Sequence, residues 1–201
     1  MFSESLKPWL VGLITAGCIG YFLYDRAAHR PVSFSGTIAE SPVQAATSAT
    51  SLQKAGYAIE PVVAYTVRAR VLSIERYRMG READLSPVDF ALGWGPMAET
   101  AVLDRLTITQ SNRWYQYRWQ NEPPIDPSLI ISSSANTHLV PANDSIKNRL
   151  LDVRPGSVVT LTGYLVNVKH TDGWSWRSSL RRDDSGDGSC ELMWVTDFTV
   201  E

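Results

Sequence analysis

The chain has 201 residues, of which 44% are hydrophobic and 20% charged, and its formal net charge is −2 at pH 7. This length accommodates an N-terminal segment and one domain, and the charge provides no general positive field for nucleic acid or anionic lipid. The two cysteines are Cys18 and Cys190. Because Cys18 falls in an apolar N-terminal segment, a disulfide within the domain is excluded.

Residues 8–24 form an uncharged, apolar stretch. As a helix it would be roughly 26 Å long, which is the low end of what crosses a hydrocarbon core. Trp9 and Tyr24, near its two ends, are residues that favour the headgroup layers. The sequence therefore predicts a single-pass transmembrane helix that contacts the lipid bilayer through residues 8–24. A lipoprotein signal ending at Cys18, a cleaved secretory signal and a buried core helix are the alternatives.

The orientation of this anchor depends on two opposing signals. Lys7 precedes the apolar stretch, whereas Arg26 and Arg30 follow it, which slightly favours a cytoplasmic C-terminal side. The short N-terminal head and the polar stretch after residue 30 are instead typical of an exported domain. We therefore expect residues 1–30 to be a head and anchor in a bacterial inner membrane, with the domain in the periplasm.

Residues 31–56 are rich in Ser, Thr, Ala and Gln, and Pro31, Gly36, Pro42 and Gly56 interrupt them. Such a composition has little apolar surface to bury and is typical of a solvated, flexible chain. The sequence therefore predicts a tether between the anchor and the domain.

The globular domain is expected over residues 57–201. Residues 62–75 are rich in β-branched side chains and alternate in polarity, which predicts a long strand with one partly solvated face. Residues 157–169, 173–180 and 190–200 predict three successive antiparallel strands separated by turn-forming Asp, Ser and Gly residues.

Shorter elements are predicted in the middle of the domain. Residues 98–106 have helical spacing, and a cap at Asn143 or Asp144 favours a second short helix through Leu151. Residues 106–119 predict two strands around a turn at Ser111. The resulting fold class is α+β, mainly antiparallel β: a small barrel of OB or SH3-like type, or a curled open sheet with helices on one face.

Aromatic side chains are the first candidates for a binding surface. Trp94 lies between two glycines, which would let an exposed indole approach a ligand closely. Residues 113–119 and 174–176 contain rows of Trp and Tyr beside Arg and Gln. Such rows pack in the core of a sheet, or they stack on a sugar or peptide.

His138 is the histidine whose neighbours suit acid–base chemistry, and Asn136 lies two residues before it. A Ser–His–Asp set can be assembled from Ser133 or Ser178, His138 and Asp144. However, the sequence has no Gly-x-Ser-x-Gly motif of the kind that presents a nucleophilic serine. A histidine that fixes a loop by local hydrogen bonds is the favoured interpretation.

Charged side chains near the C-terminus have two interpretations. Arg177 and Arg181, together with Arg182, Arg68 and Arg70, would bind a carboxylate or phosphate if their strands were neighbours. Ion pairs with Asp183, Asp184 and Glu191 are the favoured alternative. The histidines and cysteines lack zinc-site spacing, and residues 183–188 lack the final bidentate acid of a calcium loop, so no metal or other cofactor is expected.

Three segments, residues 89–97, 134–142 and 173–180, together resemble uncharacterised bacterial single-pass membrane-anchored proteins. The resemblance covers most of residues 57–201 and implies one domain behind a single span. It carries no activity over to this chain.

These observations predict a membrane-tethered, non-enzymatic binding or assembly module of the bacterial cell envelope. It would engage a protein partner in a membrane complex, or a cell-wall glycan, through Trp94, Asn136, His138, Arg177 and Arg181. A hydrolase with His138 as general base is the first alternative. A small barrel that binds nucleic acid is the second, and the acidic balance of the domain argues against it.

Overall fold

The computed structural model describes residues 11–20 and 31–201, which belong to two units, Met1–Pro31 and Val32–Glu201. In the first unit, residues 11–20 are helical and exposed. No helix in the described part of the chain combines the length and apolarity that crossing a bilayer requires. The span expected over residues 8–24 extends beyond the described residues at both ends.

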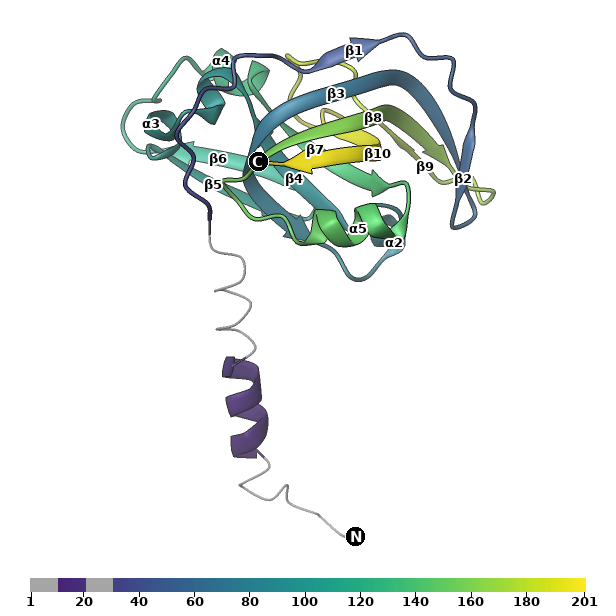
Figure 1. Ribbon diagram of the computed structural model, residues 1–201, viewed down its shortest axis with the longest axis horizontal. Helices are drawn as coiled ribbons and strands as arrows, with labels where there is room; N and C mark the ends of the chain where they lie inside the picture. Colours follow the sequence, from purple (N-terminus) through teal and green to yellow (C-terminus); the bar gives the residue numbers. More distant parts are fainter. Residues whose placement is uncertain (1–10, 21–30) are drawn as a thin grey trace. The chain divides into compact units, whose positions relative to one another are not determined.

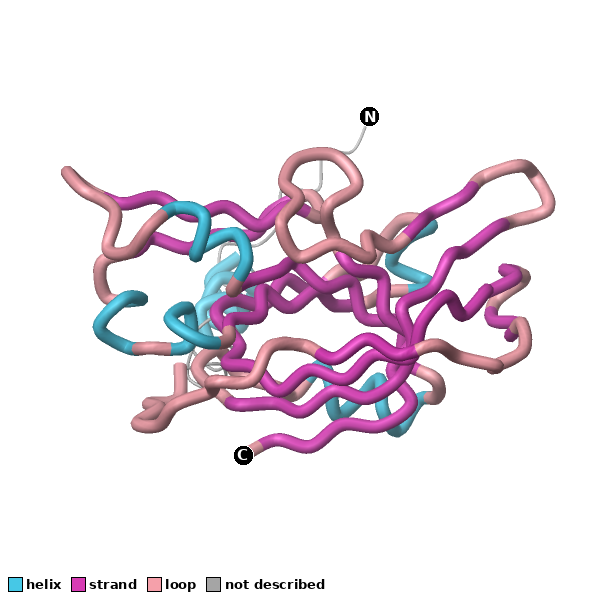
Figure 2. Tube along the Cα trace, turned by 90° about the horizontal axis from the view of Figure 1, so that it is seen from above, coloured by secondary structure: helices cyan, strands magenta, loops and turns pink. Residues whose placement is uncertain are grey.

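The second unit is built on a sheet of eight strands that is partly closed into a ring (Figure 1; Figure 2). The strands of the ring pair in the order β3 (Tyr57–Arg76), β4 (Val88–Gly93), β7 (Ser134–Pro141), β10 (Glu191–Val200) and β8 (Val158–Lys169). β8 also pairs with β3, which closes the ring. The β7–β10 pair is parallel and the other ring pairs are antiparallel.

The length of β3 makes this closure possible. Its residues up to Arg70 pair with β8, and its residues from Arg70 onward pair with β4. Alternate side chains of β3, such as Tyr65, Val67 and Ala69, are buried, as expected for a strand with one face toward a core. The long strand predicted from residues 62–75 is therefore confirmed.

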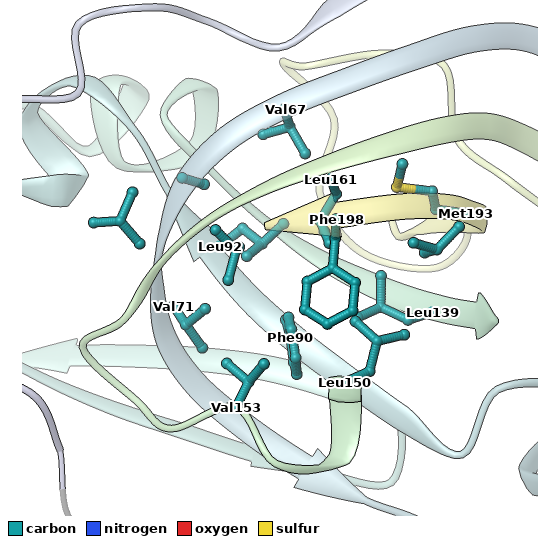
Figure 3. Packing of buried hydrophobic residues seen from close by; sticks show 14 of the residues in the cluster. Val67, Val71, Phe90, Leu92, Leu139, Leu150, Val153, Leu161, Met193 and Phe198 are labelled. Atoms are coloured by element: carbon teal, nitrogen blue, oxygen red, sulfur yellow. The ribbon is translucent and has the colours of Figure 1, made fainter. Parts of the chain in front are cut away.

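The main hydrophobic core fills the ring, and Figure 3 shows its packing. Each ring strand contributes inward side chains, among them Val67, Phe90, Leu92, Leu139, Leu161, Met193 and Phe198. Helix α5 (Asp144–Leu151) adds Ile146 and Leu150 to the same core. The Asn143 side chain caps this helix by accepting a hydrogen bond from the Ile146 N–H at 3.0 Å. The predicted α+β, mainly β class is confirmed.

The long connection between β4 and β7 carries a separate hairpin of β5 (Leu106–Ser111) and β6 (Trp114–Trp119). Asn112 and Arg113 form its two-residue turn, and both have positive φ angles, as type I′ hairpin turns require. Short helices complete the domain: α2 (Arg81–Leu85), η1 (Gly95–Ala98), α3 (Thr100–Leu103) and α4 (Pro127–Ser132). The two predicted helices correspond to α3 and α5, whereas the pattern analysis missed α2 and α4.

Residues 31–56 were expected to be a flexible tether, but all of them except Pro31 belong to the folded unit, which begins at Val32. β1 (Val43–Ala45) and β2 (Leu52–Lys54) both pair with β3. Ile38 is only 1% exposed and packs in the main core. The tether is thus corrected to an ordered strap, because backbone pairing to β3 and one buried anchor hold a chain whose side chains are mostly small and polar.

Candidate functional site

A polar site lies on the outer face of β4 and β7. Because side chains alternate along a strand, Phe90 and Leu139 point into the core while their neighbours Asp89 and His138 point outward. The antiparallel register places Asp89 directly opposite His138. The hairpin β5–β6 and the short strand β9 (Ser175–Arg177) supply the residues that cover this face.

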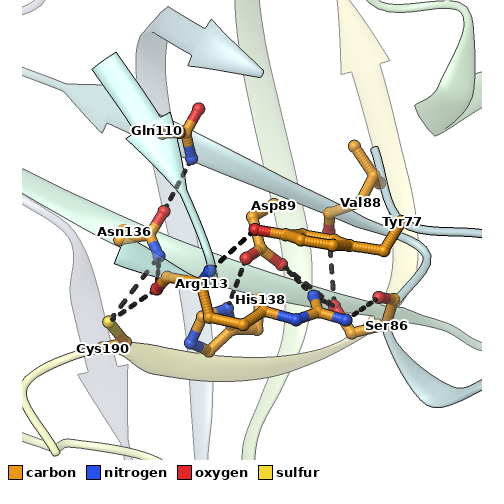
Figure 4. A network of polar contacts seen from close by, with 9 residues as sticks. All are labelled: Tyr77, Ser86, Val88, Asp89, Gln110, Arg113, Asn136, His138 and Cys190. Carbon is orange, nitrogen blue, oxygen red and sulfur yellow. Dashed lines mark hydrogen bonds and ion pairs between the residues drawn. The ribbon is translucent and has the colours of Figure 1, made fainter. Parts of the chain in front are cut away.

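The Asp89 carboxylate is the centre of the site (Figure 4). It is fully buried, with Oδ1 2.6 Å from the Arg113 Nη1 and Oδ2 2.8 Å from the His138 Nδ1. Burial of an ionised carboxylate is costly unless cations and hydrogen-bond donors compensate for the lost water. The pairing with Arg113 supplies that compensation. A charged residue in the otherwise apolar strand β4 is therefore tolerated.

Arg113 is held in place from several directions. Its Nη2 donates to the Ser86 carbonyl oxygen at 2.9 Å, and its backbone N–H donates to the Tyr77 hydroxyl at 2.9 Å. The guanidinium lies 3.6 Å from the centroid of the Tyr77 ring and 5.4 Å from that of Trp176. Stacking on aromatic rings stabilises a guanidinium that has lost its hydration on burial. The turn of the β5–β6 hairpin is thereby fixed to the ring of strands.

His138 is almost completely buried, and its ring lies 4.8 Å from the Trp176 ring at an angle of 45°. Its Nδ1 lies 2.8 Å from the Asp89 carboxylate, and neither atom makes a hydrogen bond to a described residue. Nε2 lies on the ring edge that faces away from Asp89 and makes no hydrogen bond to a described residue. Such an edge can accept a hydrogen bond from a ligand hydroxyl or amide, or a proton from a reacting group.

Asn136 joins the hairpin to β7 and β10. Its Nδ2 donates to the Arg113 carbonyl oxygen at 2.8 Å and lies 3.6 Å from the Cys190 sulfur, and its Oδ1 accepts from the Gln110 Nε2 at 2.8 Å. Burial raises the pKa of Cys190 to about 11, so this thiol stays protonated at neutral pH. Cys190 is therefore a poor nucleophile.

Two neighbouring cavities open on this face. The first, here called the main cleft, has a volume of about 440 Å³ and is lined by Arg113, Trp114, His138, Trp174, Trp176 and Arg177 among others. The second, here called the side pocket, has a volume of about 110 Å³ and is lined by Trp114, Tyr115, Asn136, Arg181 and Cys190 among others. The volume of the main cleft is in the range of small-molecule sites.

Four of the five residues singled out from the sequence line these cavities. His138 and Arg177 line the main cleft, and Asn136 and Arg181 line the side pocket. Trp94 does not, because it is only 2% exposed and packs in the main core. The expected exposed indole is therefore wrong: backbone hydrogen bonds from Trp94 to Ser133 and from Gly95 to Ile38 fix this loop against the domain.

The carboxylate that contacts His138 is Asp89, whereas the triad expected from the sequence contained Asp144. The Ser178 hydroxyl accepts a hydrogen bond from the Leu192 N–H at 3.0 Å and donates to the Ser179 carbonyl oxygen at 2.8 Å. Ser178 thus ties the chain after β9 to β10. Asp89, Arg113 and Tyr77 were not among the site residues expected from the sequence. A single acidic residue inside an apolar strand was the signal that could have indicated Asp89.

The arginines near the C-terminus form ion pairs, as the favoured interpretation predicted. Arg181 pairs with Asp183 on the surface and Arg182 pairs with Glu191, a carboxylate that is almost completely buried. Arg177 makes no ion pair with any described residue. Within the described part of the chain, no group of three or more His, Cys, Asp or Glu side chains is arranged to hold a metal ion.

Comparisons with known proteins give no match: no family model, no curated protein and no solved structure is similar to this chain.

Proposed function

We propose that residues 32–201 are an OB-type binding module and that its ligand occupies the main cleft. In chain order, the ring strands pair as first, second, third, fifth and fourth, and the fourth returns to the first. The third and fifth strands are parallel, and helix α5 lies between the third and fourth. These are the connections of the five-stranded OB barrel, which supports this class over the SH3-like barrel and the open sheet.

The position of the site is the observation that carries the proposal. OB barrels bind oligosaccharides and oligonucleotides on the face of their second and third strands, between the loop joining strands one and two and the loop joining strands four and five. Here, β4 and β7 provide that face with His138. Glu82 comes from the first of those loops, and Trp174, Trp176 and Arg177 come from the second.

The chemistry of the main cleft favours a neutral, hydroxyl-rich ligand. Its three tryptophans, Trp114, Trp174 and Trp176, suit the flat apolar face of a sugar ring. The charge of Arg113 is already matched by Asp89, and Glu82 opposes the charge of Arg177 at the same cleft. A polyanion needs a surplus of unmatched cations, which this cleft does not offer. We therefore infer that the ligand is a glycan of the cell envelope.

Binding without catalysis is the activity that the site supports best. The His138 Nε2 has no hydroxyl or thiol of a described residue within hydrogen-bond distance, and the Cys190 thiol is protonated at neutral pH. A hydrolase is the second candidate, because the Asp89–His138 pair is suited to a general base that acts on a water molecule.

The location of the module rests on the sequence. We propose that residues 8–24 anchor it in a bacterial inner membrane and that the domain is periplasmic, where cell-wall glycan is available. A protein partner in a membrane complex is compatible with this arrangement.

The test is a titration of the detergent-solubilised full chain with the hexamer of N-acetylglucosamine, followed by tryptophan fluorescence. Binding should change the emission, because three indoles line the main cleft. His138→Ala should weaken the binding by about tenfold, the equivalent of one lost hydrogen bond to the ligand. His170→Ala is the matched control, since His170 lies beside a surface turn and lines neither cavity.

The same titration separates the rival functions. A single-stranded oligothymidine that binds with steep salt dependence, with no response to the sugar hexamer, would replace the glycan with nucleic acid. Release of shorter sugars during incubation, abolished by His138→Ala, would make the protein a hydrolase.

A further inference from the structure

We infer that the ligand is a chain of at least two sugar units, which passes over Trp114 from the main cleft into the side pocket, and that the side pocket takes a neutral amide substituent of the second unit. This inference rests on the proposed function, because it assumes that the main cleft binds a glycan.

The two cavities share two lining residues, Trp114 and Cys190. A ligand unit in the main cleft and a group in the side pocket would therefore lie on either side of the same indole. The side pocket is about a quarter of the volume of the main cleft, at about 110 Å³ against about 440 Å³. It suits one substituent, whereas the main cleft suits a ring.

Trp114 has the exposure that stacking on a ligand requires. It is 40% exposed. The other aromatic side chains of β6 point to the opposite face of the hairpin and pack inward. No ring of another described residue stacks on the Trp114 indole. A large exposed indole without a ring partner is available to cover the flat face of a sugar.

The charges at the side pocket indicate that its occupant is neutral. Arg181 already pairs with Asp183, and Arg182 already pairs with Glu191. The Asp184 carboxylate accepts a hydrogen bond from the Ser179 hydroxyl. An anionic group would compete with Asp183 and Glu191 for these arginines, whereas a neutral amide can use the remaining hydrogen-bonding positions on the pocket wall. Among envelope glycans, an acetamido substituent on an amino sugar has this chemistry.

The junction between the cavities is rigid, which favours simultaneous binding of both parts of a chain. Trp114 directly follows Arg113, which is anchored on Asp89. Cys190, the other shared residue, lies against the Asn136 amide that also binds the Arg113 backbone. A binding surface that is already ordered loses little entropy when the ligand arrives.

The test is a calorimetric titration of the full chain in detergent with N-acetylglucosamine and with its dimer, trimer and hexamer. We expect the affinity to rise by at least tenfold from monomer to dimer and then to level off. In Trp114→Ala, the ratio of dimer to monomer affinity should fall to within about twofold of one. Trp114→Phe should retain part of the increase, and Val43→Ala, which removes an exposed apolar side chain outside both cavities, should retain all of it.

Two results would overturn the inference, and only the first of them is compatible with the proposed function. If the monomer binds to the wild-type chain as tightly as the dimer, the second unit makes no contact and only the proposed function remains. If no member of the series binds, the glycan itself is wrong. Thermal unfolding of each variant shows whether a loss of affinity reflects a loss of folded protein.

Discussion

Two groups of charged side chains each contain a buried carboxylate, and the second group also lines the side pocket. The outer group consists of Asp89, Arg113 and His138. The inner group contains Glu191, which faces the same way as the core residue Met193, together with Arg182 and Tyr65. Both groups pair a buried carboxylate with an arginine that comes from a neighbouring turn or loop.

The two groups differ in how completely their arginine is hydrogen-bonded. Arg113 binds a carboxylate and a carbonyl oxygen and stacks on Tyr77. In the inner group, two Arg182 nitrogens, the Tyr65 hydroxyl and one Glu191 oxygen make no hydrogen bond to a described residue. In the outer group, the same is true of Asp89 Oδ2 and His138 Nδ1, although these two atoms lie 2.8 Å apart. Burial raises the pKa of Glu191 to about 7, although the charge of Arg182 lowers it. The outer group therefore fixes the position of its arginine, and the inner group is suited to responding to pH.

The largest expected effect comes from breaking the outer group. Asp89→Ala should lower the free energy of unfolding by about 3–5 kcal/mol, because it leaves the Arg113 charge buried without its partner. Urea denaturation measures this loss. Glu60→Ala removes one member of the exposed Glu60–Lys169 pair and should cost less than about 1 kcal/mol. Equal effects of the two substitutions would show that Asp89 is not a structural centre.

The inner group should make the stability of the domain depend on pH. The pKa of Glu191 is raised from 4.5 to about 7 on folding, so the folded state holds its proton more tightly than the unfolded state. The resulting stabilisation is complete below about pH 4.5 and is lost as the pH rises through about 7, a decrease of on the order of 3 kcal/mol.

Urea denaturation between about pH 4 and about pH 8 measures this decrease. Glu191→Gln should abolish that part of the pH dependence, because the amide carries no titrating proton. Arg182, Asp184, Tyr65 and Cys190 are the charged or titratable groups that interact with Glu191, and all four are retained in the variant. Parallel stability curves for the wild type and the variant would contradict the prediction.

A smaller loss of stability is expected when one hydrogen bond is removed from the outer group. Tyr77→Phe removes the hydroxyl that accepts from the Arg113 N–H but keeps the ring over the guanidinium. The expected loss is about 1 kcal/mol in the free energy of unfolding, the value of one hydrogen bond. Tyr164→Phe is the control, since the Tyr164 hydroxyl bonds to no described residue. A Tyr77→Phe variant as stable as the wild type would indicate that stacking alone fixes the turn.

The smallest effect on stability is expected at the mouth of the main cleft. Arg177→Ala removes an exposed side chain that has no ion pair with a described residue, so the free energy of unfolding should change by less than about 0.5 kcal/mol. Binding of the N-acetylglucosamine hexamer should weaken about fivefold. Arg118→Ala, on the exposed side of the hairpin and outside both cavities, should bind as the wild type does.

The local sequence pattern was sufficient to predict those elements whose structure depends on consecutive residues. Alternation over residues 62–75 predicted β3, and the segments around β8 and β10 were predicted as strand-forming runs bounded by turn residues. The hairpin at Ser111 and the Asn143 cap were predicted because each depends on a few consecutive residues. The strap over residues 31–56 was missed, because its order comes from backbone pairing to β3, which composition does not reveal.

The sequence by itself determined a β-rich domain and drew attention to His138, Asn136, Arg177 and Arg181. Only the tertiary structure decided that Asp89 is the partner of His138 and that Trp94 is buried. The register between β4 and β7 brings Asp89 to His138, and packing of its loop against the core buries Trp94. Both depend on contacts between residues far apart in the chain, which propensity and periodicity do not encode.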